Sequence, residues 1–271
     1  MIPVDAQTMR EVAPHFSGEL ADHQAKIIAA VGEVLASTLD EYEINTPLRA
    51  AHFLGQTCHE SAGFRTTEEF ASGADYEGRK DLGNTKPGDG VRYKGRGLIQ
   101  LTGRANYKTY GKALGIDLEN DPLRAADPVL SLRIACEYWK AKKINAACDN
   151  DDLIAVTRLI NGLLNGLDDR RTYTTKAKNA IARLLGIQLS GQQGDSDHPI
   201  LRRGSKGDDV VQLQKLLAQA GFALGIDGDF GAGTEVAVKS LQSDNGVDAD
   251  GIVGDQTWKI LLAATTKKTN S

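Results

Sequence analysis

Residues 47–63 read PLRAAHFLGQTCHESAG, and this stretch sets the helical character of the chain's first part. Its apolar residues return every three or four positions, which is the spacing of one face of an α-helix. Proline is tolerated in the first turn of a helix, and glycine commonly follows the last residue. The stretch therefore predicts a helix from Pro47 to about Ala62, with Gly63 as its terminator. The residues that carry the spacing are Leu48, Ala51, Leu54 and Cys58.

Helical spacing also dominates on both sides of this stretch. Upstream, apolar residues between positions 19 and 42 predict another amphipathic helix. Residues 72–97 are rich in Gly, Asp and Lys, which predicts a long irregular segment with short turns. Patterns with the period of two that strands require are few, so residues 1–187 are predicted to form a mainly all-α domain. Further helices are predicted at 104–114, 127–142, 151–162 and 168–186.

A second, smaller domain is predicted near the C-terminus. The polar stretch QLSGQQGDSDHP at 188–199 is typical of a linker. Beyond it a short pattern occurs twice, as DGDFGAGT at 227–234 and as DGIVGDQT at 250–257. Each copy predicts a Gly-rich turn and a Thr cap ahead of a helix. Residues 200–265 therefore predict a three-helix domain, followed by a tail at 266–271. Its helices are predicted at 208–220, 235–243 and 258–264.

The composition excludes several classes of protein. Of the 271 residues, 41% are hydrophobic and 25% are charged, which is normal for a globular protein with a core. The formal net charge of −4 lacks the basic footprint of a nucleic-acid binder. No apolar run reaches the roughly 18 residues of a membrane span, and the N-terminus lacks the pattern of a secretory signal. We therefore expect synthesis in the cytoplasm, no membrane insertion and no nucleic-acid partner.

The cysteines do not predict a disulfide framework. The chain has three of them, an odd and small number, at Cys58, Cys136 and Cys148. Buried, reduced thiols are the expectation. Because no CxxC pair or Cys/His cluster has the spacing of a zinc site, no metal or other cofactor is expected.

Two glutamates could serve glycosidic hydrolysis, which needs a pair of carboxyl groups flanking the bond. Glu60 and Glu69 are nine residues apart. In one continuous helix they would be about 13.5 Å apart along the axis and on opposite faces. The pair therefore requires the helix to end near Gly63 and the chain to fold back. Glu68 competes with Glu69, and the zinc-protease pattern that His59-Glu60 could begin fails because Gly63 occupies its second His position.

Two further polar segments could contact a sugar. The first, at 93–107, reads YKGRGLIQLTGRANY, and the second, at 160–170, reads INGLLNGLDDR. In the first, Gln100, Thr102 and Asn106 supply donors and acceptors that suit sugar hydroxyl and acetamido groups. Taken alone, each segment also fits an ordinary loop or helix cap.

Together and in order, HESAGF at 59–64, the segment 93–107 and the segment 160–170 resemble glycoside hydrolase family 19. They are most similar to the phage endolysin branch of that family. The resemblance covers residues 1–187 and implies a lysozyme-like helical fold and inversion at the anomeric carbon. The carboxyl groups of inverting enzymes are about 6.5–9.5 Å apart, to leave room for water.

The resemblance also implies roles for individual residues. Glu60 would be the general acid, Glu69 the general base, and Thr102 would help to hold the attacking water. The chain departs from the plant chitinases of the family in its shorter segment between the two glutamates, in Ala105 where they carry Tyr, and in lacking their cysteine framework. The implied substrate-binding residues are His59, Tyr93, Gln100, Asn106, Asn161 and Arg170.

The C-terminal segment is similar to the three-helix peptidoglycan-binding domain of wall hydrolases, through LRRGSKGDDV at 201–210, the repeats and Thr257-Trp258. The two resemblances imply a monomeric endolysin of the muramidase (lysozyme) type. Its partner would be the glycan strand of peptidoglycan, and a holin would release it from the host bacterial cytoplasm to the wall. A chitinase, or a non-catalytic wall-binding phage structural protein, remains an alternative, and the type of glycosidic bond stays open.

Overall fold

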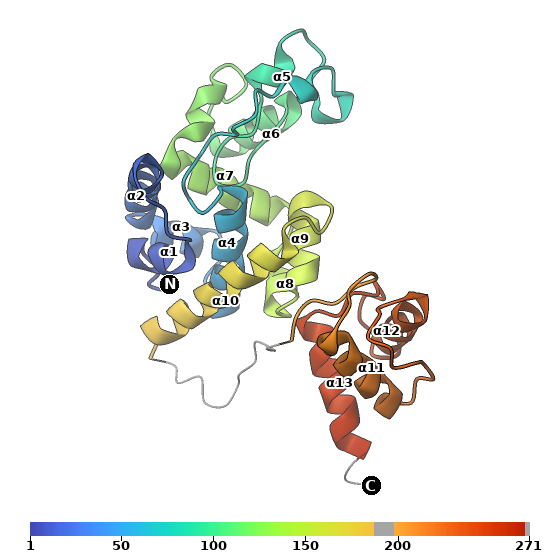
Figure 1. Cartoon of the computed structure of the whole chain (residues 1–271). Coiled ribbons are helices and arrows are strands. Elements are labelled where there is room, and N and C mark those ends of the chain that lie inside the picture. Colours follow the sequence, from blue (N-terminus) through green and yellow to red (C-terminus); the bar gives the residue numbers. More distant parts are fainter. Residues whose placement is uncertain (187–197, 269–271) are drawn as a thin grey trace. The chain divides into compact units, whose positions relative to one another are not determined.

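The computed structural model describes residues 1–186 and 198–268 (Figure 1). The chain divides into a larger unit, which holds most of residues 1–186, and a smaller C-terminal unit. Both units are helical, and within the described residues only isolated β-bridges occur, so the predicted mainly all-α fold class is confirmed. Most of the predicted linker 188–199 and the end of the predicted tail lie outside the described residues.

The larger unit is a set of helices around one core. The helices that surround the core are α1 (Ala6–Val12), α2 (Glu19–Gly32), α3 (Leu35–Glu41), α4 (Pro47–Glu60), α6 (Arg104–Leu114), α7 (Pro128–Ala141), α8 (Asn145–Asp149), α9 (Leu153–Asn161) and α10 (Leu167–Leu184). The short turns are η1 (Ala74–Tyr76), η2 (Lys80–Leu82), α5 (Asp89–Arg92) and η3 (Pro122–Ala126). The first three of these turns lie in the segment 72–97, as its composition predicted.

Helix α4 is the central element of this unit. The Thr46 hydroxyl caps its N-terminus by accepting from the backbone N–H of Arg49 at 3.3 Å. Residues 50–58 of the helix are all buried. Its most extensive packing is against α10, and the two helices cross at Gly55. A Cβ at Gly55 would lie 2.1 Å from Oγ1 and 2.8 Å from Cα of Thr174, so only glycine allows this crossing.

Two helical regions differ from the prediction. The helix expected at 19–42 is divided into α2 and α3, and α1 and α8 were not expected. Gly32, at the end of α2, lies against α1, where an added Cβ would come within 2.5 Å of the Ala6 backbone. Helix α1 begins with a capping box in which the Asp5 side chain accepts from the N–H of Thr8 at 2.9 Å.

The smaller unit contains α11 (Asp208–Ala220), α12 (Ala232–Asp244) and α13 (Asp255–Lys268), the last running past the predicted 258–264. Phe230 and Trp258 are fully buried in its core. Each sequence repeat is held by one buried glutamine. Gln214 bonds the side chains of Asp227 and Thr234, and Gln242 bonds Asp250 and Thr257 in the same way. The repeat in sequence is therefore a repeat in structure.

Two further observations on the described residues concern the cysteines and membrane-spanning helices. The three cysteines are free and buried, as expected. Burial raises the pKa of the Cys58 thiol, so it stays protonated. Among the helices of residues 1–186 and 198–268, none has both the length and the apolar character that a bilayer crossing requires.

Candidate active site

The chain reverses direction directly after Glu60, the last residue of α4. Ala62, Gly63 and Phe64 all have positive φ, at 52°, 83° and 59°. Such angles are uncommon for Ala and strained for a bulky Phe, so the surroundings must hold them. The Ser61 hydroxyl does so by donating to the Thr57 carbonyl at 2.6 Å and accepting from the N–H of Phe64 at 3.0 Å. The helix therefore ends just before Gly63, as the glutamate pair required.

The Glu60 carboxylate is held by a buried arginine. Nη2 of Arg170 donates to Oε1 of Glu60 at 2.5 Å, and Nη1 donates to Oε1 of Gln56 at 2.5 Å. Gln56 in turn donates to the Thr157 hydroxyl at 3.2 Å. Arg170 is only 2% exposed and Gln56 is fully buried, so this network is shielded from water. The other Glu60 oxygen, Oε2, accepts no hydrogen bond from any described residue.

The turn between α9 and α10 positions this arginine. The Asn165 carbonyl accepts from Nε of Arg170 at 3.0 Å and from the Asn161 amide at 3.4 Å. The next residue, Gly166, lies beneath His59, where an added Cβ would come within 2.0 Å of the imidazole. Burial and the nearby Arg170 lower the pKa of His59, so its ring is uncharged at neutral pH.

The Glu69 carboxylate lies in a different environment. The Tyr76 hydroxyl donates to Oε1 at 2.8 Å, and the backbone N–H of Gly95 donates to Oε2 at 3.0 Å. The backbone N–H of Glu69 also donates to the Gly95 carbonyl at 2.9 Å. Burial, and then the hydrogen bond to Glu69, raise the pKa of the Tyr76 hydroxyl to about 12. Both donors stabilise negative charge on the Glu69 carboxylate.

Glu68 differs from its neighbour in its contacts. Its carboxylate is 3.3 Å from the Lys94 ammonium and 3.3 Å from Nε of Arg96, and its side chain is 44% exposed. It therefore serves as the counter-ion of two cations, whereas Glu69 carries no such ion pair among the described residues.

The polar segment after Gly95 turns back toward Glu69. Gln100 has a positive φ of 52°, and an added Cβ at Gly95 would lie 2.9 Å from its amide oxygen and 3.1 Å from Oε2 of Glu69. The Thr102 hydroxyl donates to the Gln100 carbonyl at 2.8 Å, and the Asn106 amide donates to the Thr102 carbonyl at 2.7 Å. Gln100, Thr102 and Asn106 thus form one connected group near Glu69.

Two of the implied substrate-binding residues, Tyr93 and Arg170, are buried and make contacts within the protein. Tyr93 is 1% exposed, and its hydroxyl donates to the Glu119 carbonyl at 2.8 Å. Its ring packs edge-on against Tyr107, so its main role is to support the segment. Arg170 directs its guanidinium at Glu60 and Gln56 and holds the Glu60 carboxylate in place.

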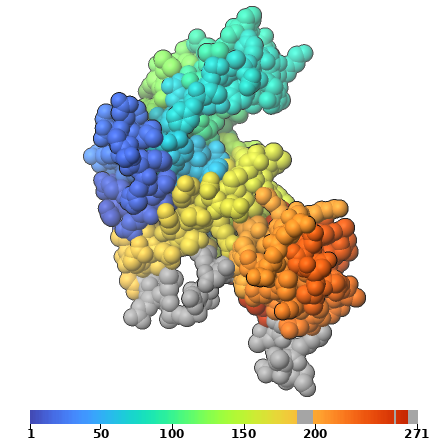
Figure 2. Space-filling model, viewed as in Figure 1, coloured from blue at the N-terminus to red at the C-terminus, as the bar shows by residue number. Residues whose placement is uncertain are grey.

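Two residues of the site, Gln56 and Tyr76, have no role that the sequence pattern predicts. Gln56 precedes Glu60 by one helical turn, and that spacing places both on one face of α4. Tyr76 comes from the irregular segment, where no periodicity relates it to Glu69. Figure 2 shows the surface of the larger unit indented between the cyan segment that contains Tyr76 and the yellow segment of α9.

The described residues contain no cluster of three or more His, Cys, Asp or Glu side chains that could bind a metal ion. The two carboxyl groups of the site lie in different environments. One is bonded by an arginine through a single oxygen, and the other is bonded by neutral donors at both oxygens.

Comparison with known proteins assigns both units to families. Residues 23–158 match the glycoside hydrolase 19 family, described as Chitinase class I. Residues 206–261 match the family described as Putative peptidoglycan binding domain.

Individual proteins are similar to parts of this chain. A Glycosyl hydrolase family 19 domain-containing protein of Haemophilus influenzae is 30% identical over 53% of this chain and 85% of its own length. Acidic endochitinase Q of Nicotiana tabacum is 37% identical, but the match spans 38% of this chain and 39% of the tobacco enzyme. A solved bacterial family 19 chitinase is 24% identical over 70% of this chain and 98% of its own, with a TM-score of 0.49.

Proposed function

The chain belongs to glycoside hydrolase family 19 and carries a C-terminal peptidoglycan-binding domain, and on this premise we propose that it hydrolyses β-1,4 bonds of bacterial peptidoglycan. We propose peptidoglycan as the polymer because residues 206–261 match a peptidoglycan-binding family. A tethered wall-binding domain raises the local concentration of wall bonds around the glycosidase. We propose further that the protein is a monomeric endolysin of the muramidase type. A phage holin would release it from the host cytoplasm to the wall.

Glu60 acts as the general acid in this proposal. Arg170 occupies Oε1 at 2.5 Å and fixes the plane of the carboxyl group, while Oε2 is left without a protein donor among the described residues. The proton on Oε2 is then the one that passes to the glycosidic oxygen as the bond to the anomeric carbon breaks. General acid catalysis of this kind contributes about 10²–10⁴-fold in rate.

Glu69 acts as the general base on a water molecule. The Thr102 hydroxyl donates its hydrogen bond to the Gln100 carbonyl, so its oxygen acts as an acceptor toward water. A water that donates one O–H to Glu69 and the other to Thr102 has a lone pair left for the anomeric carbon. Glu69 takes the proton from this water as the new C–O bond forms on the face opposite the leaving group.

The stereochemistry of the first product tests this mechanism. A soluble β-1,4-linked glycan fragment of peptidoglycan is cleaved in an NMR tube, and the anomeric proton of the new reducing end is followed before mutarotation. Direct attack by water predicts the α-anomer first. Initial formation of the β-anomer would mean a covalent intermediate and would remove the role assigned to Glu69.

A chitinase is the second candidate, because the matched catalytic family is described as Chitinase class I. Both polymers are β-1,4-linked, so the same two carboxyl groups would serve. Turnover of chitin oligomers and of peptidoglycan glycan, compared as kcat/KM, decides between them, and a preference for peptidoglycan is expected.

A further inference from the structure

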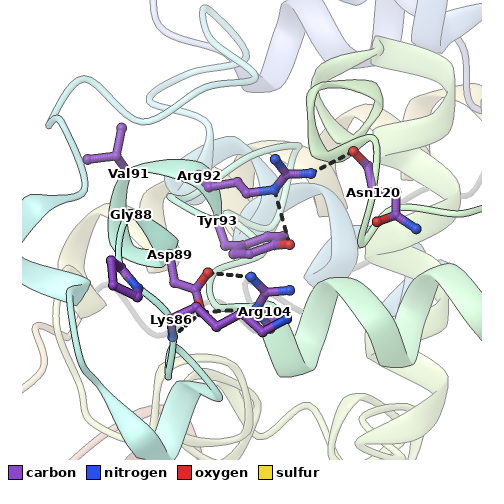
Figure 3. Close-up of a pocket in the computed structure, with 9 residues that line it drawn as sticks. Lys86, Gly88, Asp89, Val91, Arg92, Tyr93, Arg104 and Asn120 are labelled. Carbon is purple, nitrogen blue, oxygen red and sulfur yellow. Dashed lines mark hydrogen bonds and ion pairs between the residues drawn. The ribbon is translucent and has the colours of Figure 1, made fainter.

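A cavity of about 650 Å³ opens beside the segment that bonds Glu69, and the mechanism above does not use it (Figure 3). The segment 86–93, the start of α6 and Asn120 line it. Its lining carries three cations, Lys86, Arg92 and Arg104, and a single acidic side chain, Asp89. The side chains that line the cavity are therefore positive on balance, whereas the chain has a formal net charge of −4.

One of the three cations is neutralised within the protein. Arg104 donates to both oxygens of Asp89, at 2.9 and 2.5 Å, and it donates to Glu119 at 3.2 Å. Asp89 also accepts from the backbone N–H of Thr85 at 3.0 Å and from that of Lys86 at 2.9 Å. The Arg104–Asp89 ion pair therefore has its hydrogen bonds satisfied within the lining of the cavity.

The other two cations lack a carboxylate partner among the described residues. Arg92 donates to the Asn120 carbonyl at 2.7 Å and to the Tyr93 hydroxyl at 3.1 Å (Figure 3). It also donates to the Glu119 carbonyl at 3.4 Å, and all three acceptors are neutral. These bonds hold the guanidinium in place without cancelling its charge. No ion pair of the Lys86 ammonium occurs within the same part of the chain. Nη1 of Arg92, which donates to no described residue, and the Lys86 ammonium therefore remain available to bind a carboxylate.

The cavity is close to the proposed general base. Arg92 precedes Gly95 by three residues, so their Cα atoms are at most about 11 Å apart. The N–H of Gly95 donates to Glu69 at 3.0 Å. A peptide of four residues that branches from a bound sugar can extend about 14 Å, which spans this separation.

We infer that this cavity binds the free carboxylates of the peptide stems of peptidoglycan, through Arg92 and Lys86. The inference rests on the proposed function and extends it. Chitin has no carboxylate, so a cavity that binds one gives the catalytic unit itself a preference for the wall polymer. Stem binding beside Glu69 also places the branched sugar next to the reacting bond.

The test compares intact peptidoglycan with the same glycan strands after an amidase has removed the stems. The variant is Lys86→Gln/Arg92→Gln. Its matched control, Lys26→Gln/Lys112→Gln, removes two exposed charges elsewhere on the larger unit. New reducing ends measure kcat/KM. The cavity variant is expected to lose about tenfold on intact peptidoglycan and to equal wild type on stripped strands, while the control keeps wild-type rates on both.

An equal loss by the cavity variant on both substrates, no loss on either, or an equal loss in the control would overturn the inference. If the wild type releases no reducing ends from either polymer, the proposed function itself fails, and the inference fails with it.

A binding measurement separates this site from catalysis. A free acidic stem peptide is titrated into the full chain and followed by the backbone amide NMR signals of Lys86, residues 88–93 and Asn120. Saturable shifts are expected with wild type, and they should vanish with the cavity variant. They should also vanish when the peptide's carboxylates are converted to carboxamides. Shifts that survive amidation would contradict recognition of carboxylates.

Discussion

The arginine that bonds Glu60 is 110 residues away from it in the chain, which limits what a sequence can reveal at the scale of single residues. The order of motifs identified Glu60 and Glu69, and Gly63 predicted the turn between them. The contact of Arg170 with Glu60 and Gln56 depends on the crossing of α4 and α10, and no local pattern encodes it. The burial of Tyr93 likewise depends on contacts that no local pattern encodes.

The contacts of the adjacent glutamates predict which is the base. Glu69→Gln should lower kcat about 10²–10⁴-fold, because it removes the proton acceptor for water. Glu68→Gln should keep kcat within a few fold, because that carboxylate is exposed and pairs with Lys94 and Arg96. Initial rates on peptidoglycan, with melting temperatures to show folding, measure both. A greater loss in Glu68→Gln would reverse the assignment.

Asp89 predicts an acid-dependent loss of stability. Hydrogen bonds from Arg104 lower the pKa of Asp89 from 3.8 to about 2. A carboxyl group whose pKa is lower in the folded state stabilises the fold fully above its unfolded pKa, and this contribution disappears as the pH falls from about 4 through about 2. Asp89→Asn should therefore lower the free energy of unfolding by about 2 kcal/mol at pH 7.

Urea unfolding at pH 7 and near pH 2 measures this effect. The difference between Asp89→Asn and wild type should shrink toward zero at the lower pH. A difference that is the same at both pH values would show that the ion pair with Arg104 is not its source.

At the scale of elements, strong local signals predicted helices well and tertiary contacts caused the errors. The bounds of α6 and α11 are those predicted, 104–114 and 208–220. The expected helix 19–42 is divided into α2 and α3, and α2 ends at Gly32, where α1 packs too closely to allow a Cβ. Helix α8 spans only Asn145–Asp149, too short for a periodicity to show.

The crossing of α4 and α10 predicts an unusual response to alanine. In a helix interior Gly→Ala is favourable by up to about 1 kcal/mol. At Gly55 the added Cβ would lie 2.8 Å from the Thr174 backbone, so Gly55→Ala should destabilise the protein by about 1–3 kcal/mol. Because Arg170 precedes Thr174 by one turn of α10, activity should fall as well.

The control for this prediction is Gly233→Ala in α12, where an added Cβ meets nothing within 4 Å. That variant should be neutral or stabilising by up to about 1 kcal/mol. Thermal and urea unfolding of both variants measure the effects. Stabilisation by Gly55→Ala would mean that the two helices move apart without cost.

At the scale of the whole molecule, the two units predict separable contributions to wall lysis. A chain that ends at residue 194 should lose about 10²-fold in apparent activity on insoluble cell walls, because it loses the tether. Its kcat on soluble glycan fragments should stay near that of the full chain. Pull-down with purified walls and initial rates on both substrates measure this. Equal loss on both substrates would instead give the C-terminal unit a structural role.

The sequence could predict the existence and character of both units, because each depends on local periodicity and repeats. It could not predict how the two carboxyl groups are held, because Tyr76, Gly95 and Arg170 reach them from other elements.

The most direct test of the central claim is mass spectrometry of the fragments that the full chain releases from purified peptidoglycan, with new reducing ends marked by borohydride. The proposal predicts reduced muramic acid ends with the wild type and a loss of about 10²–10⁴-fold in their rate of formation with Glu60→Gln. Fragments cut only at peptide or amide bonds, or an undiminished rate in Glu60→Gln, would contradict hydrolysis by the Glu60 and Glu69 pair.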